Sequence, residues 1–490
     1  MGTETSYKLS PIMKPINSSL FVLLTVVTMS CGRSPQQQPP LSLHPENPHY
    51  FLFREKPAIL IGSTEHYGAV MNLDFDYVTY LTEIASSGLN VTRTFSGVYV
   101  EPAEAFGIKK NTMAPAPEKY ICPWPRSSEP GYANGGNKFD LSKWDDAYFS
   151  RLKDFVTAAG KRNIVVELDL FSNFYDTIQW KLSPLNMRNN INGIGNIQDQ
   201  KEILSLRHPE IIDIQEKMVR KIISELKDFD NLYYEICNEP YFGDTLALKE
   251  WEKHMTGIVV EAEKDFSSKH LISNNIANFY RLVSDPRDGV SIYNFHYARP
   301  PVTVAKNYHL NKVIGDNETG FVGIEDAVYR TEAWDFILAG GGLFDHLDYS
   351  FTSDNEDGSF KVEPGQPGGG GKTLRNQFKI LAEFMHGIDY INMLPVNNDR
   401  LRLPEPEKLT VQGLAKGEEE FAMYFHRKDS TNIGSVIEIN LHDGSYKLTW
   451  VDTKTAGQTV EYLKNHPGGW AKITSPDYSK DIALKVVKTN

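Results

Sequence analysis

The stretch Leu232-Tyr233-Tyr234-Glu235-Ile236-Cys237-Asn238-Glu239-Pro240 runs from apolar residues to an amide, a carboxylate and a proline. A short apolar run of this kind is typical of a buried strand, and proline stops regular strand pairing. Side chains alternate along a strand, so Glu235 and Cys237 should share the side of Glu239 and lie below it. The stretch predicts a strand that presents Glu239 at its C-terminal end. The alternative is a carboxylate that only caps the following helix.

Similar apolar runs recur along the chain and alternate with stretches of helical period, which is the pattern of a parallel sheet covered by helices. Helices are expected at 74–87, from Ser142 with Asp145 as a capping box, from Pro209, and at 244–266, 326–338 and 373–385. We predict a (β/α)8 TIM barrel, with a doubly wound open sheet as the alternative. The eight expected strands are Ala58–Ile61, Asn90–Phe95, Ile164–Leu170, Leu232–Cys237, Leu271–Ser273, Val290–Phe295, Lys312–Gly315 and Leu343–Tyr349.

Two of the loops that follow strands are long, at about 97–141 and 172–208. In a barrel, the loops at the C-terminal ends of the strands carry the chemistry. Their aromatic residues can wall a cleft, although any single ring is as well explained by packing. These aromatic residues are Tyr120, Trp124, Tyr132, Phe174, Tyr175 and Trp180.

Beyond about Leu394 the pattern changes to short strands, which predicts a second domain. Asp443-Gly444 is a two-residue hairpin signal, and apolar residues alternate with polar ones over Tyr446–Val451. A small all-β sandwich is expected after the barrel. Its strands are expected at 420–426, 436–441, 446–451, 459–463, 470–474 and 482–487.

The N-terminus has the features of an export signal. Lys8 and Lys14 precede the uncharged run Ser18–Ser30, and Cys31 follows directly. The run is too short to span a membrane comfortably, and the cysteine resembles the lipidated residue of bacterial lipoproteins. We expect residues 1–31 to be the signal, 32–48 a flexible linker, 49–393 the catalytic barrel and 394–490 the sandwich. The protein should then be exported as a cell-surface or periplasmic lipoprotein, attached to the membrane only through a lipid on Cys31, or be secreted.

The bulk composition narrows the class of partner. A formal net charge of −12 argues against a nucleic-acid partner, because proteins bind nucleic acids through clustered Lys and Arg side chains. A neutral carbohydrate fits better, and the 24 tyrosines and 7 tryptophans supply rings that can stack on sugars. Only Cys122 and Cys237 remain after the signal segment, so no disulfide framework is expected.

A second stretch, Val313-Ile314-Gly315-Asp316-Asn317-Glu318-Thr319-Gly320, also carries carboxylates at the end of a short apolar strand. By strand alternation Asp316 has the same parity as Glu318 and is the second choice for its role. Hydrolysis of a glycosidic bond needs one carboxyl group to protonate the departing oxygen and another to attack the anomeric carbon or activate water. Glu239 and Glu318 together can supply both.

On these motifs the chain resembles clan A of the glycoside hydrolases, the retaining β/α-barrel enzymes that include the cellulase-like family five, over about 50–387. The resemblance implies that Asn238-Glu239 corresponds to the Asn-Glu pair at the end of the fourth strand, with Glu239 as acid/base. It implies that Glu318 is the nucleophile on the seventh strand. The implied activity is cleavage of β-glycosidic bonds in a polysaccharide or oligosaccharide, without a cofactor.

Further matches extend the resemblance, which implies that Arg93 orients the nucleophile, that His296 contacts the sugar and that Tyr297 lies near the nucleophile. There are also departures. The third strand contains Glu167–Phe171 where many cellulase-like members have a histidine. The tryptophan common on the eighth strand is absent, and Tyr349 or Phe351 is expected to replace it.

Glu65-His66-Tyr67 follows the first strand and is expected to reach the substrate. A Glu-His pair can also indicate a metal site, but the sequence has no HExxH arrangement and no cysteine cluster, so no metal is expected. Two alternatives stay open. One is a catalytically inactive barrel that binds carbohydrate or matrix protein at the cell surface. The other is a metal-dependent barrel hydrolase.

Overall fold

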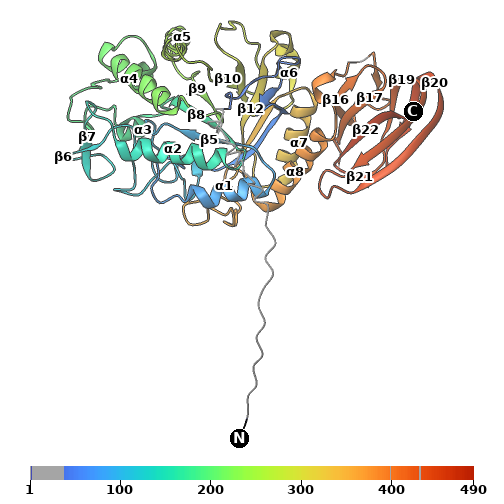
Figure 1. Ribbon diagram of the computed structural model, residues 1–490, viewed down its shortest axis with the longest axis horizontal. Helices are drawn as coiled ribbons and strands as arrows, with labels where there is room; N and C mark the ends of the chain where they lie inside the picture. The colour runs from blue at the N-terminus through green and yellow to red at the C-terminus, as the bar shows by residue number, and fades with distance from the viewer. Residues whose placement is uncertain (1, 3–37, 398, 430–431, 490) are drawn as a thin grey trace. The chain divides into compact units, whose positions relative to one another are not determined.

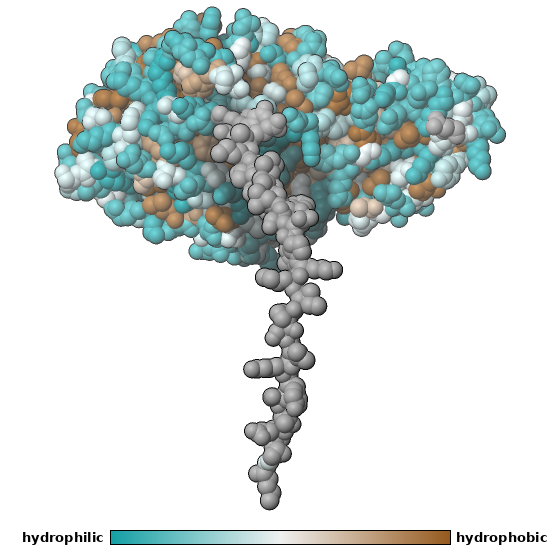
Figure 2. All heavy atoms as spheres, viewed as in Figure 1, coloured by the Kyte–Doolittle hydropathy of each residue, from teal (hydrophilic) through white to brown (hydrophobic). Residues whose placement is uncertain are grey.

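The computed structural model describes residues 2, 38–397, 399–429 and 432–489. The expected signal segment and Cys31 therefore lie outside the described residues, and the fold presented here is that of Gln38–Asn490. Within the described part, none of the helices combines the length and apolar character needed to cross a membrane. The face shown in Figure 2 is mainly hydrophilic, with apolar residues scattered singly or in small groups.

Eight parallel strands form a closed barrel, which confirms the predicted architecture (Figure 1). The barrel closes where β13 pairs with β4, with Leu343 opposite Leu60. All eight expected strands are present in the expected order. They are β4 (Leu60–Thr64), β5 (Val91–Phe95), β8 (Val165–Ser172), β9 (Leu232–Asn238), β10 (Ile272–Asn278), β11 (Ile292–His296), β12 (Val313–Thr319) and β13 (Leu343–Leu347).

Helices follow most of the strands. The helix expected from Ser142 begins later, because the side chain of Asp145 accepts hydrogen bonds from the backbone N–H groups of Ala147 and Tyr148, whereas the Ser142 hydroxyl donates to Asp140. Proline opens α4 at the first helical position, as expected. The helices are α1 (Tyr77–Ser86), α2 (Asp146–Gly160), α3 (Thr177–Leu182), α4 (Pro209–Leu226), α5 (Thr245–Ala262), α6 (Val302–Asn307), α7 (Asp326–Leu338) and α8 (Lys372–His386).

A three-stranded antiparallel sheet precedes the barrel: β1 (Ser42–Leu43), β2 (Phe51–Phe53) and β3 (Lys56–Ala58). Leu41 is fully buried in one cluster with Phe51 and with Leu60 of the first barrel strand. Other members of the cluster, such as Val91 and Val313, begin barrel strands, so the small sheet closes the N-terminal end of the barrel. Ordered packing thus begins before residue 49, where the barrel domain was expected to start.

The C-terminal domain is an antiparallel sheet in the order β14-β16-β17-β22-β19-β15, with β20 paired to β19. Asp443-Gly444 does not form the expected hairpin turn. It lies inside one long strand, whose pairing with β20 shifts between Gly444 and Tyr446. The long strands carry the sheet over itself, so that Phe421 and Ile437 meet in one apolar core. The main strands are β14 (Leu394–Pro395), β15 (Leu401–Arg402), β16 (Leu409–Lys416), β17 (Glu420–Arg427), β19 (Val436–Val451), β20 (Gln458–Thr474) and β22 (Asp481–Thr489), and β18 (Asn432–Ile433) pairs with β21 (Tyr478–Ser479).

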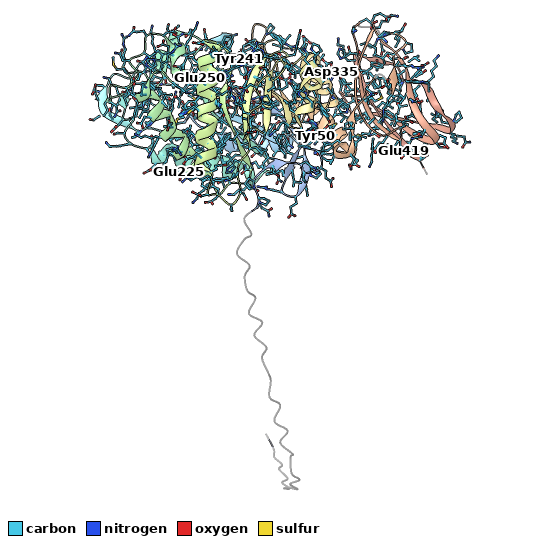
Figure 3. The ribbon with its side chains drawn as sticks, turned by 90° about the horizontal axis from the view of Figure 1, so that it is seen from above. Tyr50, Glu225, Tyr241, Glu250, Asp335 and Glu419 are labelled. Atoms are coloured by element: carbon cyan, nitrogen blue, oxygen red, sulfur yellow. The ribbon has the colours of Figure 1, made fainter. Side chains whose placement is uncertain are left out.

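Helix α7 joins the barrel to this sheet by packing against β16 and β17 (Figure 1). Arg330 of α7 donates two hydrogen bonds to Asp481, at 2.9 and 2.6 Å, and both side chains are buried. Asp335, labelled in Figure 3 where the helix meets the sheet, pairs with His426 at 3.0 Å. The contact between the two domains is therefore polar as well as apolar.

Candidate active site

Glu239 and Glu318 lie at the C-terminal ends of β9 and β12 and line the same pocket, whose volume is about 360 Å³. An oxygen of each carboxyl group and a ring nitrogen of His296 all lie within 4.8 Å of one another. Both glutamates are nearly buried, with 7% of each exposed. The two carboxyl groups on which the sequence interpretation depends are therefore neighbours in one pocket.

Glu318 is held by three donors. Tyr67 Oη donates to Oε2 at 2.7 Å, and Arg93 Nη1 donates to the same oxygen at 3.1 Å. Tyr297 Oη donates to Oε1 at 2.5 Å. Because the donors approach both oxygens, the carboxylate has a fixed orientation toward the pocket.

Glu239 has a different set of partners. Tyr175 Oη donates to Oε2 at 2.7 Å, while Tyr241 Oη and His296 Nδ1 donate to Oε1 at 3.0 and 2.9 Å. Burial raises the pKa of this carboxyl, but the bonds from His296 and the two tyrosines outweigh burial and lower the pKa below its ordinary value. The resting form of Glu239 is therefore the carboxylate.

His296 lies between the two glutamates and is fully buried. Burial lowers its pKa, but the nearby charges of Glu318 and Glu239 more than compensate, so the pKa is raised above 6.5. Its other ring nitrogen meets Asn275 Nδ2 at 2.6 Å. Glu239 and His296 are thus a coupled pair in which the histidine holds a proton close to the carboxylate.

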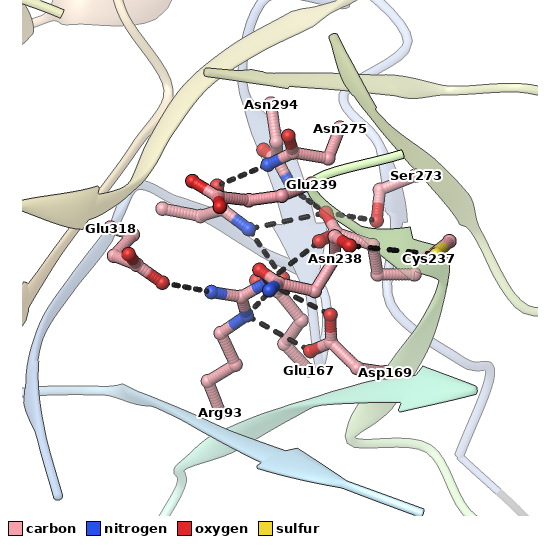
Figure 4. Close-up of polar contacts among 12 residues, drawn as sticks. Arg93, Glu167, Asp169, Cys237, Asn238, Glu239, Ser273, Asn275, Asn294 and Glu318 are labelled. Carbon is pink, nitrogen blue, oxygen red and sulfur yellow. Dashed lines mark hydrogen bonds and ion pairs between the residues drawn. The ribbon is translucent and has the colours of Figure 1, made fainter. Parts of the chain in front are cut away.

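Below the pocket, Arg93 binds a group of buried carboxylates (Figure 4). Its guanidinium donates two bonds to Asp169, at 2.9 and 2.8 Å, and one to Glu235 at 2.8 Å. Glu167 lies 3.1 Å away, and burial raises its pKa to about 8. One cation therefore anchors Glu318 to the polar interior of the barrel.

Asp316 does not share the pocket with Glu318. The prediction from strand alternation that the two side chains lie on the same side was therefore wrong. The pairing of β12 shifts between Asp316 and Thr319, so strand alternation fails there. Asn317 turns into the barrel interior, where its Nδ2 donates to Glu167 at 2.6 Å, while Asp316 is buried away from the pocket and accepts from the backbone N–H of Ala298.

Of the residues expected to bind substrate, four line the pocket, namely His66, Tyr67, Asn238 and Tyr297. Asn238 and Glu239 are adjacent, yet both face the pocket, because the backbone leaves the strand at Glu239 with a φ of 50°. His66 Nε2 pairs with Glu101 Oε2 at 2.9 Å. This pairing orients the imidazole at the pocket wall.

Four other expected residues do not line the pocket. Arg93 and His296 are fully buried behind the glutamates, so they act on the carboxyl groups. Glu65 is also fully buried and accepts from the backbone N–H groups of Gly68 and Ala69, which organises the loop after β4. Tyr349 lies behind Phe321, with ring centroids 6.2 Å apart, and Phe351 packs against Tyr80.

Several residues of the site were missed by sequence reasoning. Tyr241 follows Glu239-Pro240 directly and donates to Glu239, although it does not line the pocket. Glu101 lies in the long loop after β5 and carries no local motif. Among the aromatic residues of the long loops, Tyr175 lines the pocket, whereas Tyr120, Trp124 and Trp180 are packed inside.

Two groups of side chains in the described part have the spacing of metal ligands. One comprises Glu239, His296 and Glu318, and the other comprises Glu167, Asp169 and Glu235. The Arg93 guanidinium occupies the centre of the second group. In the first group, hydrogen bonds from His296 and neighbouring tyrosines already satisfy the carboxylates.

Residues 79–300 match the model of the cellulase family, glycosyl hydrolase family 5. The matched segment contains Arg93, Asn238, Glu239 and His296 and ends before Glu318. None of the curated proteins matches the chain.

Two solved structures resemble the described fold. One is a glycoside hydrolase with 13% sequence identity and a TM-score of 0.60, covering 92% of this chain and 97% of its own. The other is a glycoside hydrolase family 5 protein from Bacteroides vulgatus, with 14% identity, a TM-score of 0.61, and coverage of 92% and 93%. The resemblance to cellulase-like barrels is confirmed, and the chain has a glycoside hydrolase family 5-like fold with an appended sheet domain.

Proposed function

We propose that the protein is a retaining glycoside hydrolase that cleaves β-glycosidic bonds by double displacement, with Glu318 as nucleophile and Glu239 as acid/base. The observation that supports this most is the approach of the two carboxyl groups within 4.8 Å in one pocket. Retaining enzymes place their carboxyl groups about 5–5.5 Å apart, whereas inverting enzymes leave about 6.5–9.5 Å for a water molecule. The short separation favours direct attack by a side chain.

In the first step, a Glu318 oxygen attacks the anomeric carbon while the glycosidic oxygen departs with a proton from Glu239. This forms a glycosyl ester on Glu318. In the second step, Glu239 takes a proton from water, the water oxygen attacks the same carbon, and the ester bond to Glu318 breaks. Arg93, Tyr67 and Tyr297 keep the attacking carboxylate oriented in the first step and stabilise it as the leaving group in the second.

The lowered pKa of Glu239 bears on the source of the proton. A general acid must deliver a proton, yet the pKa of Glu239 is lowered, while the pKa of the neighbouring His296 is raised. The Nδ1–Oε1 hydrogen bond of 2.9 Å provides a direct path for a proton between the imidazole ring and the carboxyl group. We assign the catalytic proton to the Glu239–His296 pair, with Glu239 as the group that faces the substrate.

The test compares two variants on a panel of dinitrophenyl glycosides, whose leaving group departs without a proton. Glu318→Ala should lose turnover on every substrate, because no glycosyl ester can form. Glu239→Ala should still be glycosylated, and azide should accelerate its second step by forming a glycosyl azide. Proton NMR of the wild-type product should show retained β configuration when it first forms.

Asp316→Asn is the matched control, because it removes a carboxyl group from the same strand but outside the pocket. It should keep wild-type turnover. Equal loss in both glutamate variants without an azide effect would refute the assigned roles. Unchanged turnover in both would favour the binding alternative, and loss of wild-type turnover in a chelator would favour the metal-dependent one.

Export and lipid attachment through Cys31 are also proposed, on the sequence pattern alone. A lipidated protein should sediment with the membrane fraction of a bacterial host and incorporate labelled palmitate. Cys31→Ala should remove the label and release the protein. Labelling that persists in Cys31→Ala would contradict this site.

A further inference from the structure

Four phenylalanines form the mouth of the pocket. Each comes from a different loop at the C-terminal end of the barrel, and each is 40–55% exposed. The residues deeper in the pocket are polar and buried, since Glu101, Asn238, Glu239 and Glu318 are each at most 7% exposed. The pocket therefore changes from a hydrogen-bonding floor to an apolar rim. We call this rim the phenylalanine collar: Phe106, Phe242, Phe279 and Phe321.

Ring contacts connect the collar around most of the mouth. Phe106 meets Phe321 at a centroid distance of 6.5 Å and Tyr175 at 5.3 Å. Phe242 continues this series of ring contacts on one side and Phe279 continues it on the other, through edge or tilted contacts. These remaining contacts are Tyr175–Phe242 at 5.5 Å, Tyr297–Phe321 at 6.1 Å and Phe279–Tyr297 at 6.4 Å. A polymer crossing the site would have to pass between these rings, so the collar favours a ligand that enters by one end.

The backbone of the collar is strained. Phe106, Phe279 and Phe321 have φ values of 55°, 65° and 55°, a left-handed conformation that bulky residues rarely adopt. Such strain persists only where the surrounding structure enforces it, and it concentrates at ligand sites. Three strained phenylalanines from three loops around one pocket indicate a built surface rather than accidental exposure.

The collar lies beside the group that would protonate the leaving oxygen. Phe242 comes three residues after Glu239, and its ring lies 5.5 Å from Tyr175 and 5.2 Å from Tyr241. Both tyrosines donate hydrogen bonds to Glu239. The leaving group must therefore lie next to phenyl rings, which bind apolar surface and cannot hydrogen-bond sugar hydroxyls.

We propose that the phenylalanine collar binds an apolar aglycone, so that the substrates are glycosides of hydrophobic alcohols or phenols. The sugar occupies the polar floor, and the aglycone lies against Phe242 and Phe279. This inference rests on the proposed glycosidase function and narrows its substrate class. The volume of about 360 Å³ is near the lower end of ligand pockets, about 300–1,000 Å³, which suits one short glycoside.

The test uses ethyl, butyl and hexyl β-glycosides of the sugar that the dinitrophenyl panel identifies. These alcohols leave with similar intrinsic ease, so the series varies mainly the apolar surface. The value of kcat/KM for the full chain should rise by about threefold for each methylene that the collar buries. The disaccharide and longer oligomers of the same sugar should be poorer substrates than the hexyl glycoside.

Two variants locate the effect. Phe242→Ala and Phe279→Ala should each lower kcat/KM for the hexyl glycoside about tenfold and lower that for the ethyl glycoside much less, and Phe→Leu at either position should restore much of the loss. Tyr280→Ala is the matched control, because Tyr280 is 53% exposed beside Phe279 but does not line the pocket. It should change neither value.

Failure of this inference and failure of the proposed function give different results. Turnover that does not depend on alkyl length, or that increases with oligosaccharide length, would overturn the collar proposal and leave the hydrolase intact. If no glycoside is cleaved, calorimetric titration with the same alkyl glycosides still tests the collar. Affinity that rises from ethyl to hexyl and falls in Phe279→Ala would support it in a binding protein, whereas flat affinity would overturn it.

Discussion

The interior of the barrel and the core of the C-terminal sheet differ in the polarity of their side chains. At the centre of the barrel, Arg93 meets Glu167, Asp169, Glu235 and Glu318, all of them at most 7% exposed. The sheet core consists of apolar side chains such as Phe421, Met423, Ile437, Ile439 and Trp450. The centre of the barrel therefore contains charged groups, whereas the described core cluster of the sheet is apolar.

Physical chemistry gives these two interiors different roles. Removing charges from water is costly, and a buried ionic group often stabilises a fold no better than apolar residues of similar size. The charges of the barrel interior are therefore explained by what they hold, namely the carboxylate of Glu318, the proposed nucleophile, which Arg93 fixes from below. The sheet core has no such task and contributes hydrophobic burial alone. Substitutions in the barrel interior should accordingly change both activity and stability, whereas substitutions in the sheet core should change stability alone.

The largest effect is expected for Arg93→Ala. Its removal leaves four carboxyl groups without their shared cation, which should cost about 3–5 kcal/mol of unfolding free energy. Loss of the donor to Glu318 should also lower kcat about 10²–10³-fold on an activated aryl glycoside. Urea unfolding and steady-state kinetics measure the two effects.

Arg93→Lys provides the control for charge alone. It keeps a cation but not the paired bonds to Asp169 or the reach to Glu318, so stability should recover more than kcat. Full recovery of kcat by lysine would show that general electrostatics, not orientation, is what Glu318 requires.

A second large effect is expected at the boundary between the domains. Arg330→Ala leaves Asp481 buried with Tyr424 and Thr453 as remaining donors, which should cost about 3 kcal/mol. The value of kcat on a small aryl glycoside should not change, because neither residue of the pair lines the pocket. A folded Arg330→Ala protein with reduced kcat would show that the sheet supports the site.

The sequence was sufficient for the barrel because many of its strands contain short apolar runs such as Ala58–Ile61, and such runs indicate burial directly. It was also sufficient to select Glu239 and Glu318, since both stand where an apolar strand ends. Elsewhere, local irregularities of the backbone made the sequence-based side assignments wrong. The strand shift near Asp316 and the left-handed backbone at Glu239 break the two-residue alternation on which side assignments depend. Asp443-Gly444 carries a hairpin signal that the long strand β19 overrides.

Residues that join the site from distant loops carry no local signal. Glu101 and Phe106 follow β5, Phe279 follows β10 and Phe321 follows β12, and only closure of the barrel brings them to one pocket. The charged partners of Arg93 also come from three strands, so charge pairing could not be assigned before the topology was known. The candidate site could thus be predicted at its two carboxyl groups but not at its walls.

A smaller effect is expected for the proton held by the Glu239–His296 pair. His296→Gln removes one of the two places for that proton, so the pair loses it at lower pH. The alkaline limb of kcat/KM should move toward acid pH by about one unit. An unchanged limb would assign the proton to Glu239 alone.

The same pair predicts how stability depends on pH. The pKa of His296 is raised above 6.5, so its contribution is fully present below pH 6.5 and is lost as the pH rises through the folded value. The pKa of Glu239 is lowered below 4.5, so its contribution is present above pH 4.5 and is lost as the pH falls through the folded value. The advantage of wild type over His296→Gln should therefore be greatest between pH 4.5 and 6.5, as thermal unfolding can measure.

The smallest effect comes from a pair of conservative changes, one in each interior. Ile439→Val removes one methylene from the apolar core of the sheet, and Ser273→Ala removes a hydroxyl that donates to Glu235 at 3.3 Å in the barrel. Each should cost about 1 kcal/mol of unfolding free energy, the first by lost packing and the second by a lost hydrogen bond. Only Ser273→Ala should also lower kcat, because Glu235 shares the Arg93 guanidinium that holds Glu318. Equal stability losses with equal kcat values would mean that the charged interior tolerates small rearrangements as readily as the apolar one. The orientation of Glu318 would then depend on its tyrosine donors rather than on Arg93.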